Sequence, residues 1–408
     1  MIILVINSGS SSIKYQLFNM PQEEVIAKGL LERIGEEKSF FIQKSVKGSL
    51  EIEGSIATHE QGINFIIDML TDKEKGVISS VEEILGVGHR VVHGEEEFTE
   101  SVLINEKVIN RIKEYADLAP LHNPPNLMGI VACKKFLPSA VQVACFDTAF
   151  HHAIPPKAYL YGIPYELYEK YKIRRYGFHG TSHLYVKRRL VSILKRPKEE
   201  LNLITCHLGN GCSVSAIAHG KSVDTSMGFT PLEGLVMGTR CGDIDPAIIF
   251  YLTGKGYTPE DLNKLLNKKS GLMGISGISN DMRNLFWAQE KGNERAKLAI
   301  EVFCYRLRKY IGAYLAVLGK TDAIIFTGGI GENNPQIRLD TLSGMQSLGV
   351  EISEEKNLLV AKGAEAEISK DSSAVKIYVI PTNEELCIAQ DTYELTKVYP
   401  GAINLKAE

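Results

Sequence analysis

One strand-and-loop pattern occurs twice in the sequence, about half a chain apart. In each copy an apolar run with the composition of a buried strand leads into a short polar loop, and a second apolar run follows. The strand, loop and second strand are residues 2–6, 7–12 and 13–18 in one copy and residues 201–206, 207–211 and 213–218 in the other. The repetition predicts a duplicated domain, whose two loops could face each other across a cleft. The alternative is a coincidence between two ordinary hairpins, which use the same residue types.

A third strand and polar loop follow a long expected helix. Apolar residues recur at steps of three and four, as on the buried face of a helix, at Phe303, Leu307, Ile311, Tyr314 and Leu318. Gly319 ends this pattern, a short buried strand follows over residues 323–326, and the glycine-rich loop 327–334 comes next. Strands alternate with helices along the chain, which predicts an α/β fold.

Length and charge limit the possible partners. A chain of 408 residues allows two or three domains at roughly 150 residues each. The 46 Lys and Arg residues are balanced by 49 Asp and Glu residues, so the net charge of −3 offers no broad basic surface. Nucleic acid is therefore not an expected partner.

The cysteines and apolar runs indicate the compartment. The seven cysteines form no CxxC pair, which fits reduced thiols in a cytoplasmic protein. The first apolar run has no basic segment before it, and no later stretch gives about 18 uninterrupted apolar residues. We therefore expect a cytoplasmic protein with no membrane partner.

The three polar loops match neither of the common nucleotide motifs. None has the P-loop sequence GxxxxGK[ST] or the dinucleotide-binding sequence GxGxxG. Loops rich in Ser, Asn and Gly can still wrap a polyphosphate with backbone N–H and hydroxyl donors, and Lys14 lies just beyond the first loop. Because each loop follows a buried strand, the three together favour phosphate binding over ordinary turns.

The residues of these loops carry a family resemblance. Residues 6–14 (INSGSSSIK), 207–213 (HLGNGCS) and 225–246 (TSMGFTPLEGLVMGTRCGDIDP) resemble the acetate kinase family, and residues 88–94 (GHRVVHG) and 381–385 (PTNEE) occur in the expected order. The resemblance extends from Asn7 to Asp391. It implies the sugar kinase, Hsp70 and actin superfamily, with duplicated ribonuclease H-like domains that bind ATP in a cleft between two lobes. The implied lobes are residues 1–148 plus 385–408 and residues 149–384.

The implied reaction is phosphoryl transfer from ATP to acetate. A carboxylic acid with a pKa of about 4 is already an anion at neutral pH, so it can attack phosphorus without a general base. The site therefore needs cations, and Arg90 and Arg240 stand out in their apolar and glycine-rich surroundings. For either arginine alone a structural salt bridge is the more common role. In the family the matching arginines line the active site.

The resemblance also implies metal and catalytic residues. Asn7, Asp147 and Glu384 would lie near Mg²⁺ or Mn²⁺, although these residue types also form turns, cap helices or face helix dipoles. His179 would donate a hydrogen bond to the transferring phosphoryl group, with His122 as a second contributor. His179 and His183 are four residues apart, but HExxH is absent and Gly180 weakens a helix there, which argues against zinc.

Two further sets of residues follow from the resemblance. An acyl pocket would be formed, beside Arg90, by Val92, Leu121, Phe178 and Pro231. Each of these residues is equally plausible as ordinary core. Phosphates and nucleotide would be bound by Asn7, Ser10, Ser12, Lys14, His207, Gly209, Asn210, Gly211, Asp281, Met282, Arg283, Gly329, Ile330, Gly331 and Asn333.

One position departs from the family pattern. The family usually has a second glycine after His93 and Gly94, where this sequence has Glu95. The added negative charge close to Arg90 in the chain could alter the affinity for an anionic substrate.

The resemblance implies a homodimer that converts acetate and ATP to acetyl phosphate and ADP. A propionate or other short-chain carboxylate kinase is one alternative, and a non-catalytic ATP-binding switch of the same superfamily is another.

Overall fold

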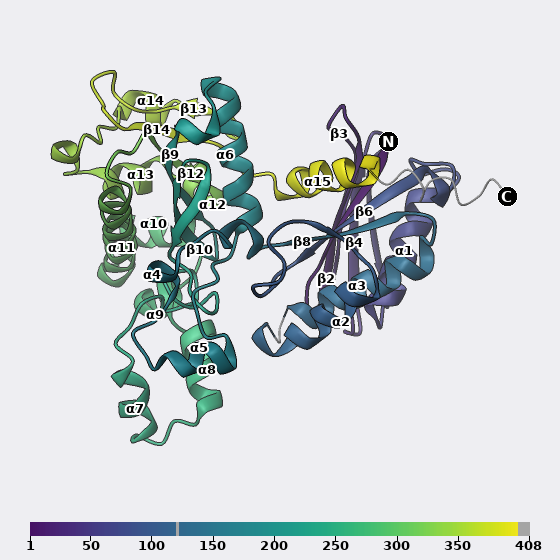
Figure 1. The fold of residues 1–408 in the computed structure, drawn as a ribbon, viewed down its shortest axis with the longest axis horizontal. Helices are drawn as coiled ribbons and strands as arrows, with labels where there is room; N and C mark the ends of the chain where they lie inside the picture. The colour runs from purple at the N-terminus through teal and green to yellow at the C-terminus, as the bar shows by residue number, and fades with distance from the viewer. Residues whose placement is uncertain (120–121, 399–408) are drawn as a thin grey trace. The chain divides into compact units, whose positions relative to one another are not determined.

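The computed structural model describes residues 1–119 and 122–398 and divides the chain into two compact units (Figure 1). The first unit comprises Met1–Phe150 and the chain from Asn383 onward, and the second comprises His151–Thr382. These boundaries differ by two residues from those expected at 148/149 and 384/385. The reason for the later difference is α15 (Glu384–Val398), which begins at Glu384 and packs on strands of the first unit.

The first unit is built on a mixed eight-stranded sheet with the order β5-β4-β3-β2-β1-β6-β8-β7. The strands are β1 (Ile2–Ser8), β2 (Ser12–Asn19), β3 (Glu24–Glu32), β4 (Ser39–Ser45), β5 (Gly48–Gly54), β6 (Ile84–Val91), β7 (Val102–Leu103) and β8 (Val141–Phe146). Strands β1 to β5 form an antiparallel meander, whereas β1, β6 and β8 are parallel. The apolar run of β1 is buried because this strand lies inside the sheet, between β2 and β6.

Helices cover both faces of the first sheet (Figure 1). Besides α15, they are α1 (His59–Thr71), α2 (Glu106–Glu114) and α3 (Asn123–Phe136). Helices α1 and α3 pack together on the face that carries Leu4 and Ile6. Helix α15 lies so close to the other face that a β-carbon on Gly88 would come within 2.4 Å of Thr392. Residues that alternate with the core along β1 and β6, including Asn7 and Arg90, therefore lie on the α15 face.

The second unit repeats the central topology of the first. Its six-stranded sheet has the order β11-β10-β9-β12-β14-β13. The strands are β9 (Asn202–Leu208), β10 (Cys212–Ala218), β11 (Lys221–Thr225), β12 (Ala323–Thr327), β13 (Ala366–Glu367) and β14 (Lys376–Val379). Strands β11-β10-β9-β12-β14 have the same relative directions as β3-β2-β1-β6-β8. The predicted duplication is confirmed, and the two polar loops occupy equivalent places between β1 and β2 and between β9 and β10.

The second unit contains helices besides its sheet. They are α4 (Pro156–Tyr159), α5 (Tyr165–Tyr171), α6 (Gly180–Leu194), α7 (Ala247–Thr253), α8 (Pro259–Lys268), α9 (Gly271–Ser276), α10 (Met282–Glu290), α11 (Glu294–Leu318), α12 (Gly328–Asn333), α13 (Pro335–Leu342) and α14 (Glu354–Leu358). Of these, α4, α6, α11 and α12 pack on the sheet strands. The expected long helix is α11, which ends at Gly319 with φ of 69°. The glycine-rich segment after β12 was expected to be a loop and is instead the short helix α12, because the Asn333 and Glu332 side chains bond back to its first residues.

No helix in residues 1–119 or 122–398 combines the length and apolar composition needed to cross a bilayer.

Candidate active site

Three polar side chains of the first unit gather at the carboxyl ends of neighbouring parallel strands. Asn7 lies near the end of β1, Arg90 near the end of β6, and Asp147 directly after β8. Because β1, β6 and β8 are parallel neighbours, residues far apart in the sequence meet at one edge of the sheet. Together with Glu384 at the start of α15, these residues are called the first-unit cluster.

Arg90 and Asp147 form a two-pronged ion pair. Arg90 Nε donates to Asp147 Oδ1 at 3.1 Å, Nη2 donates to Oδ2 at 2.6 Å, and Nη1 reaches Asn7 Oδ1 at 3.4 Å. Burial opposes the charge on Arg90, but Asp147 and Glu384 together raise the pKa of Arg90 above its usual value. The salt bridge considered as an alternative role for Arg90 is thus present. It also fixes the direction of the guanidinium group.

Glu384 is a buried carboxyl group whose Oε1 atom has no hydrogen-bond partner among the described residues. Burial raises the pKa of Glu384 to about 7, against the opposing effect of Arg90 and with help from Asp147 and Glu385. Its neighbour Glu385 lies 3.8 Å from Lys14 Nζ in an ion pair. The two adjacent glutamates are therefore distinct, because Glu385 has a cation partner and Glu384 has an unpartnered oxygen.

The first-unit cluster fits a divalent cation that also binds phosphate. In the described parts of the chain, no three His, Cys, Asp or Glu side chains form a preformed metal site. Mg²⁺ commonly takes only one or two carboxylates and completes its shell with phosphate oxygens and water. The unpartnered oxygen of Glu384 and the nearby Asp147 carboxylate are ligands of this kind.

The loop between β9 and β10 brings together the polar residues of the second unit. A β-carbon on Gly211 would lie 3.3 Å from His179 Nε2 and 3.4 Å from Arg240 Nη1, so both side chains approach this glycine. Asn210 Oδ1 accepts a hydrogen bond from Asn280 Nδ2 at 3.0 Å, and the Asn210 carbonyl accepts one from the Gly238 N–H at 3.0 Å. We call His179, Asn210, Gly211 and Arg240 the second-unit cluster.

Arg240 is a half-buried cation without a carboxylate partner in the described chain. Its Nη1 donates to the Pro231 carbonyl at 3.0 Å and contacts the Met237 sulfur at 3.7 Å. Burial lowers the pKa of Arg240, which is the reverse of the effect at Arg90. A half-buried guanidinium group that has no carboxylate beside it is suited to receive an anionic ligand.

His179 is held in an unusual backbone conformation at the start of α6. Its φ of 55° lies in the left-handed region, which costs a residue with a side chain about 1 to 2 kcal/mol. Its ring stacks on His207 with centroids 4.2 Å apart, and its Nδ1 lies 2.9 Å from Ser213 Oγ. Contacts on the side chain thus keep a strained residue next to Gly211.

The expected nucleotide residues of the second unit have varied surroundings. Asp281 caps α10 by accepting from the Arg283 N–H at 2.9 Å, and its carboxylate also pairs with the Arg283 guanidinium. Met282 is buried as a whole, at 2% exposure. Asn333 Nδ2 donates to the Gly329 carbonyl at 2.9 Å, which closes the first turn of α12. Ile330 and Gly331 lie in the same short helix.

The residues expected in the acyl pocket and in the first loop differ in how exposed they are, and one of them lies outside the described residues. Val92 and Phe178 are buried, whereas Pro231 is half-buried and His122 is exposed at the start of α3. Leu121 lies outside the described residues. In the first loop, Ser10 and Lys14 are exposed, Ser12 is half-buried, and the Gly9 N–H closes the turn on the Ser12 carbonyl at 2.7 Å. In the second loop, the Gly209 N–H bonds the Gly211 carbonyl at 3.0 Å, which closes a turn one residue shorter.

Sequence analysis missed residues that organise the second unit. Glu332 Oε1 accepts from the Gly328 N–H at 2.8 Å and from the Thr382 N–H at 3.0 Å, which ties the start of α12 to the end of the second unit. Ser213 bridges two histidines, and its place directly after the loop was the only available signal. Asn280 had no sequence signal, because its partner Asn210 is distant in the chain.

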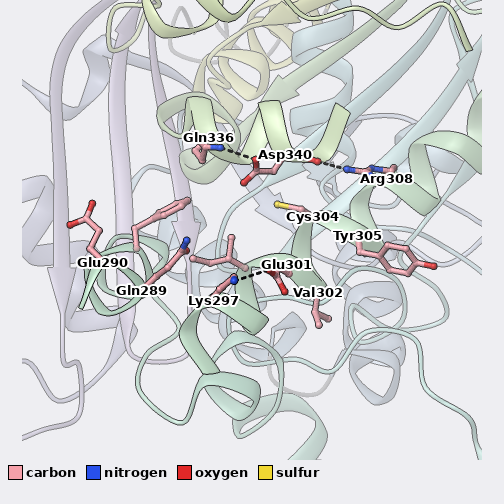
Figure 2. Close-up of a pocket in the computed structure, with 12 residues that line it drawn as sticks. Gln289, Glu290, Lys297, Glu301, Val302, Cys304, Tyr305, Arg308, Gln336 and Asp340 are labelled. Carbon is pink, nitrogen blue, oxygen red and sulfur yellow. Dashed lines mark hydrogen bonds and ion pairs between the residues drawn. The ribbon is translucent and has the colours of Figure 1, made fainter. Parts of the chain in front are cut away.

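A large groove elsewhere in the second unit does not contain the expected residues (Figure 2). It has a volume of about 780 Å³ and is lined by α10, α11 and α13. Its charged groups are largely paired with one another or with backbone carbonyls. Gln336 donates to Asp340 Oδ1 at 2.7 Å, Arg308 Nε donates to the Thr341 carbonyl at 2.8 Å, and Lys297 lies 4.0 Å from Glu301. This pattern does not favour a phosphate site.

Glu95 occupies a conformation that suits glycine. Its φ is 52°, its N–H bonds His93 Nδ1 at 3.1 Å, and its carboxylate faces the Tyr115 hydroxyl. We predict that Glu95→Gly unfolds at higher denaturant concentration than Glu95→Ala, with a difference of about 1 kcal/mol, because both variants lose the carboxylate and only alanine keeps the β-carbon. Equal midpoints for the two variants would show that the left-handed backbone carries no cost here.

The comparisons with known proteins identify the family and the fold of this chain. The model of the acetokinase family matches residues 2–390. An acetate kinase from Dictyoglomus thermophilum is 55% identical over 96% of this chain and 98% of its own, and one from Thermotoga maritima is 55% identical over 97% and 98%. The crystal structure of Porphyromonas gingivalis acetate kinase matches with a TM-score of 0.93 at 44% identity, covering 97% of this chain and 99% of that one. A propionate kinase from Francisella tularensis matches with a TM-score of 0.90 at 43% identity, covering 96% and 99%.

Three findings lead to one conclusion. The family model matches nearly the whole chain, relatives share more than half of their aligned residues with it, and a solved acetate kinase has the same duplicated α/β fold. This chain belongs to the acetokinase family.

Proposed function

We propose that this protein is an acetate kinase, which transfers the terminal phosphoryl group of ATP to acetate and forms acetyl phosphate and ADP reversibly. The observation that carries the proposal is Arg240, a half-buried cation with no carboxylate partner in the described chain, placed beside His179 and the Gly211 loop. A non-catalytic ATP switch has no carboxylate acceptor and so has less use for such a cation.

Both clusters would serve this single reaction. Acetate attacks as an anion, so its carboxylate needs positioning and charge stabilisation but no general base. Arg90, fixed by Asp147, and Arg240 would stabilise the negative charge that spreads over the transferring group. His179 would donate a hydrogen bond to the same group, and the N–H groups of the two loops would bind phosphate oxygens. The transfer is direct and in line, with no covalent enzyme intermediate.

Asn7, Asp147 and Glu384 would hold Mg²⁺, which when bound neutralises phosphate charge. The unpartnered Oε1 of Glu384 supports this assignment. The residues of this chain bind and orient the metal and the substrates. The nucleotide would lie against the second unit, near Asn210, Gly211 and α12.

The test is to trap acyl phosphate with hydroxylamine while acetate, propionate and butyrate are each supplied with Mg-ATP. Acetate should give the highest kcat/KM. A higher kcat/KM with propionate would instead favour a propionate kinase. This is the specific alternative, because a propionate kinase from Francisella tularensis matches this chain. One methylene group is worth only about 1 to 3 kcal/mol of discrimination, so all rates must be compared at subsaturating substrate. ATP hydrolysis with no trapped product from any acid would instead support the ATP-binding switch.

Glu384 gives a pH-dependent prediction. Its pKa of about 7 in the folded protein exceeds the usual carboxyl value, so the folded state retains a proton that the unfolded chain loses. The associated stability is present at pH 4 and is lost as the pH rises through 7. Without Mg²⁺, Glu384→Gln should therefore be more stable than wild type at pH 8 by on the order of 1 to 3 kcal/mol, and the advantage should shrink at pH 5.

The measurement is denaturant unfolding of both proteins at pH 5 and pH 8, with and without Mg²⁺. Added Mg²⁺ should stabilise wild type at pH 8 more than it stabilises the glutamine variant. Glu385→Gln is the comparison variant: Glu385 pairs with Lys14 and only adds to the raised pKa of Glu384, so this change should weaken the pH response without abolishing it. An identical pH response of wild type and Glu384→Gln would remove Glu384 from this role.

We also infer a cytoplasmic homodimer. Helix α7 exposes adjacent apolar side chains, with Ile248 at 42%, Phe250 at 76% and Tyr251 at 66% exposure. Such a patch is typical of an interface between subunits. The seven cysteines are free, which fits a reducing compartment. Light scattering of wild type and Phe250→Asp tests the dimer, and a wild-type protein that is monomeric at micromolar concentration would contradict it.

A further inference from the structure

The second unit contains a buried chain of hydroxyl and imidazole groups that reaches His179. Thr205 Oγ1 lies 2.7 Å from His183 Nδ1, His183 Nε2 lies 2.8 Å from Ser213 Oγ, and Ser213 Oγ lies 2.9 Å from His179 Nδ1. Thr205, His183 and Ser213 are each 0% exposed, so water does not compete for these bonds. We call these four residues the hydroxyl–imidazole relay.

The direction of the bonds follows from Thr205. A buried hydroxyl group must donate its hydrogen, and a buried donor without an acceptor costs about 1 to 3 kcal/mol. Within residues 1–119 and 122–398, the one hydrogen-bond partner of Thr205 Oγ1 is His183 Nδ1. Thr205 therefore donates, and His183 Nδ1 accepts and carries no proton.

The remaining protons are then determined step by step. Burial lowers the pKa of His183 far below its usual value, so its ring is neutral and holds its single proton on Nε2. That N–H donates to Ser213 Oγ. The Ser213 hydroxyl hydrogen is then directed at His179 Nδ1, which accepts it. An imidazole with an unprotonated Nδ1 is neutral and has its proton on Nε2.

We propose that Thr205, His183 and Ser213 are positioning residues that hold His179 as the neutral tautomer with its proton on Nε2. This nitrogen is the one near Gly211 and Arg240, so the relay would present a donor, rather than a lone pair, to an anionic phosphoryl group. The inference rests on the proposed function only for the identity of the ligand that His179 faces.

The test compares the tautomer of His179 with turnover. ¹⁵N-histidine NMR of the ligand-free full-length protein, with the His179 signals assigned by their loss in His179→Gln, should show an unprotonated Nδ1 and a protonated Nε2. Thr205→Val keeps the shape of the side chain but removes the hydroxyl group. It should shift part of the His179 population toward the Nδ1-protonated tautomer and lower kcat about tenfold, with the KM for acetate and ATP changed less than threefold. Thr205→Ser should restore both the tautomer and kcat.

Two further variants separate positioning from general damage. Ser213→Ala should produce the same tautomer change and a larger loss of kcat, on the order of 10- to 100-fold, as is common for residues that orient a functional group. Ser215→Ala is the matched control, since Ser215 is equally buried on β10 and bonds Ser222 and the Asp224 carbonyl. It should leave the His179 spectrum and kcat unchanged.

Several results would overturn the inference. A protonated Nδ1 on His179 in wild type, or a Thr205→Val variant with the wild-type spectrum and kcat, would exclude the relay as the determinant of the tautomer. Because the spectrum is recorded without substrates, failure of the relay is distinguishable from failure of the proposed function. The latter would appear as an absence of acyl phosphate in wild type with the expected spectrum intact.

Discussion

Arg240→Ala should lower kcat by about 10³-fold or more while the protein remains folded. A well-placed arginine contributes on the order of 10³ to 10⁵ in phosphoryl-transfer reactions, and Arg240 has its guanidinium beside Gly211 and His179. Its partners in the described chain are the Pro231 carbonyl and the Met237 sulfur, so no buried carboxylate is left unpaired when it is removed. Burial lowers the pKa of Arg240, which indicates that its charge costs stability. The variant should therefore unfold at a denaturant concentration equal to or above that of wild type.

The measurements are steady-state kinetics with acetate and Mg-ATP and a denaturant titration of each protein. Arg295→Ala is a matched control, because Arg295 also donates to backbone carbonyls, those of Gly274 and Ile275, but lies on α11 outside both clusters. The control should keep kcat within about twofold of wild type. An Arg240→Ala variant with near-normal turnover would remove Arg240 from the proposed chemistry.

Arg90→Ala should damage both activity and stability. It removes a cation from the first-unit cluster and leaves Asp147, which is 1% exposed, without its ion-pair partner. Breaking a buried pair from one side typically costs about 3 to 5 kcal/mol. We expect a loss of kcat of about 10³-fold or more together with a clear drop in the unfolding midpoint.

The double variant Arg90→Ala/Asp147→Ala separates the two effects. Removing both partners eliminates the unpaired charge, so much of the lost stability should return. Turnover should stay low, because the cation is still absent and the proposed metal-binding carboxylate of Asp147 is also removed. Recovery of activity in parallel with stability would mean that Arg90 acts only through the fold, and a single Arg90→Ala variant with normal stability would contradict the role of the ion pair.

The fold class could be predicted because it depends on local patterns. The apolar runs of β1 and β9 and the polar residues that follow them repeat in the sequence, and the same strand directions repeat in the structure. The segment after β12 was the exception. Its glycines predicted a loop, but side-chain bonds from Glu332 and Asn333 stabilise a helix that composition alone does not favour.

The site was predictable as a set of residues but not as an arrangement. The motifs identified Arg90 and Arg240 as the important cations and could not distinguish them. The structure gives Arg90 a bidentate carboxylate partner and leaves Arg240 with a backbone carbonyl and a thioether. Adjacent glutamates were likewise equivalent in the sequence, yet Glu385 pairs with Lys14 while Glu384 Oε1 has no partner in the described chain.

The sequence by itself determined the duplicated α/β plan, the family and the types of residue available for phosphoryl transfer, because strand periodicity and loop composition are local properties. The tertiary structure alone decided which charges are paired and how His179 is oriented. Ion pairing depends on which strands are parallel neighbours, and the relay from Thr205 through His183 and Ser213 depends on contacts between α6, β9 and β10. Such contacts join residues that are distant in the chain, so no local pattern contains them.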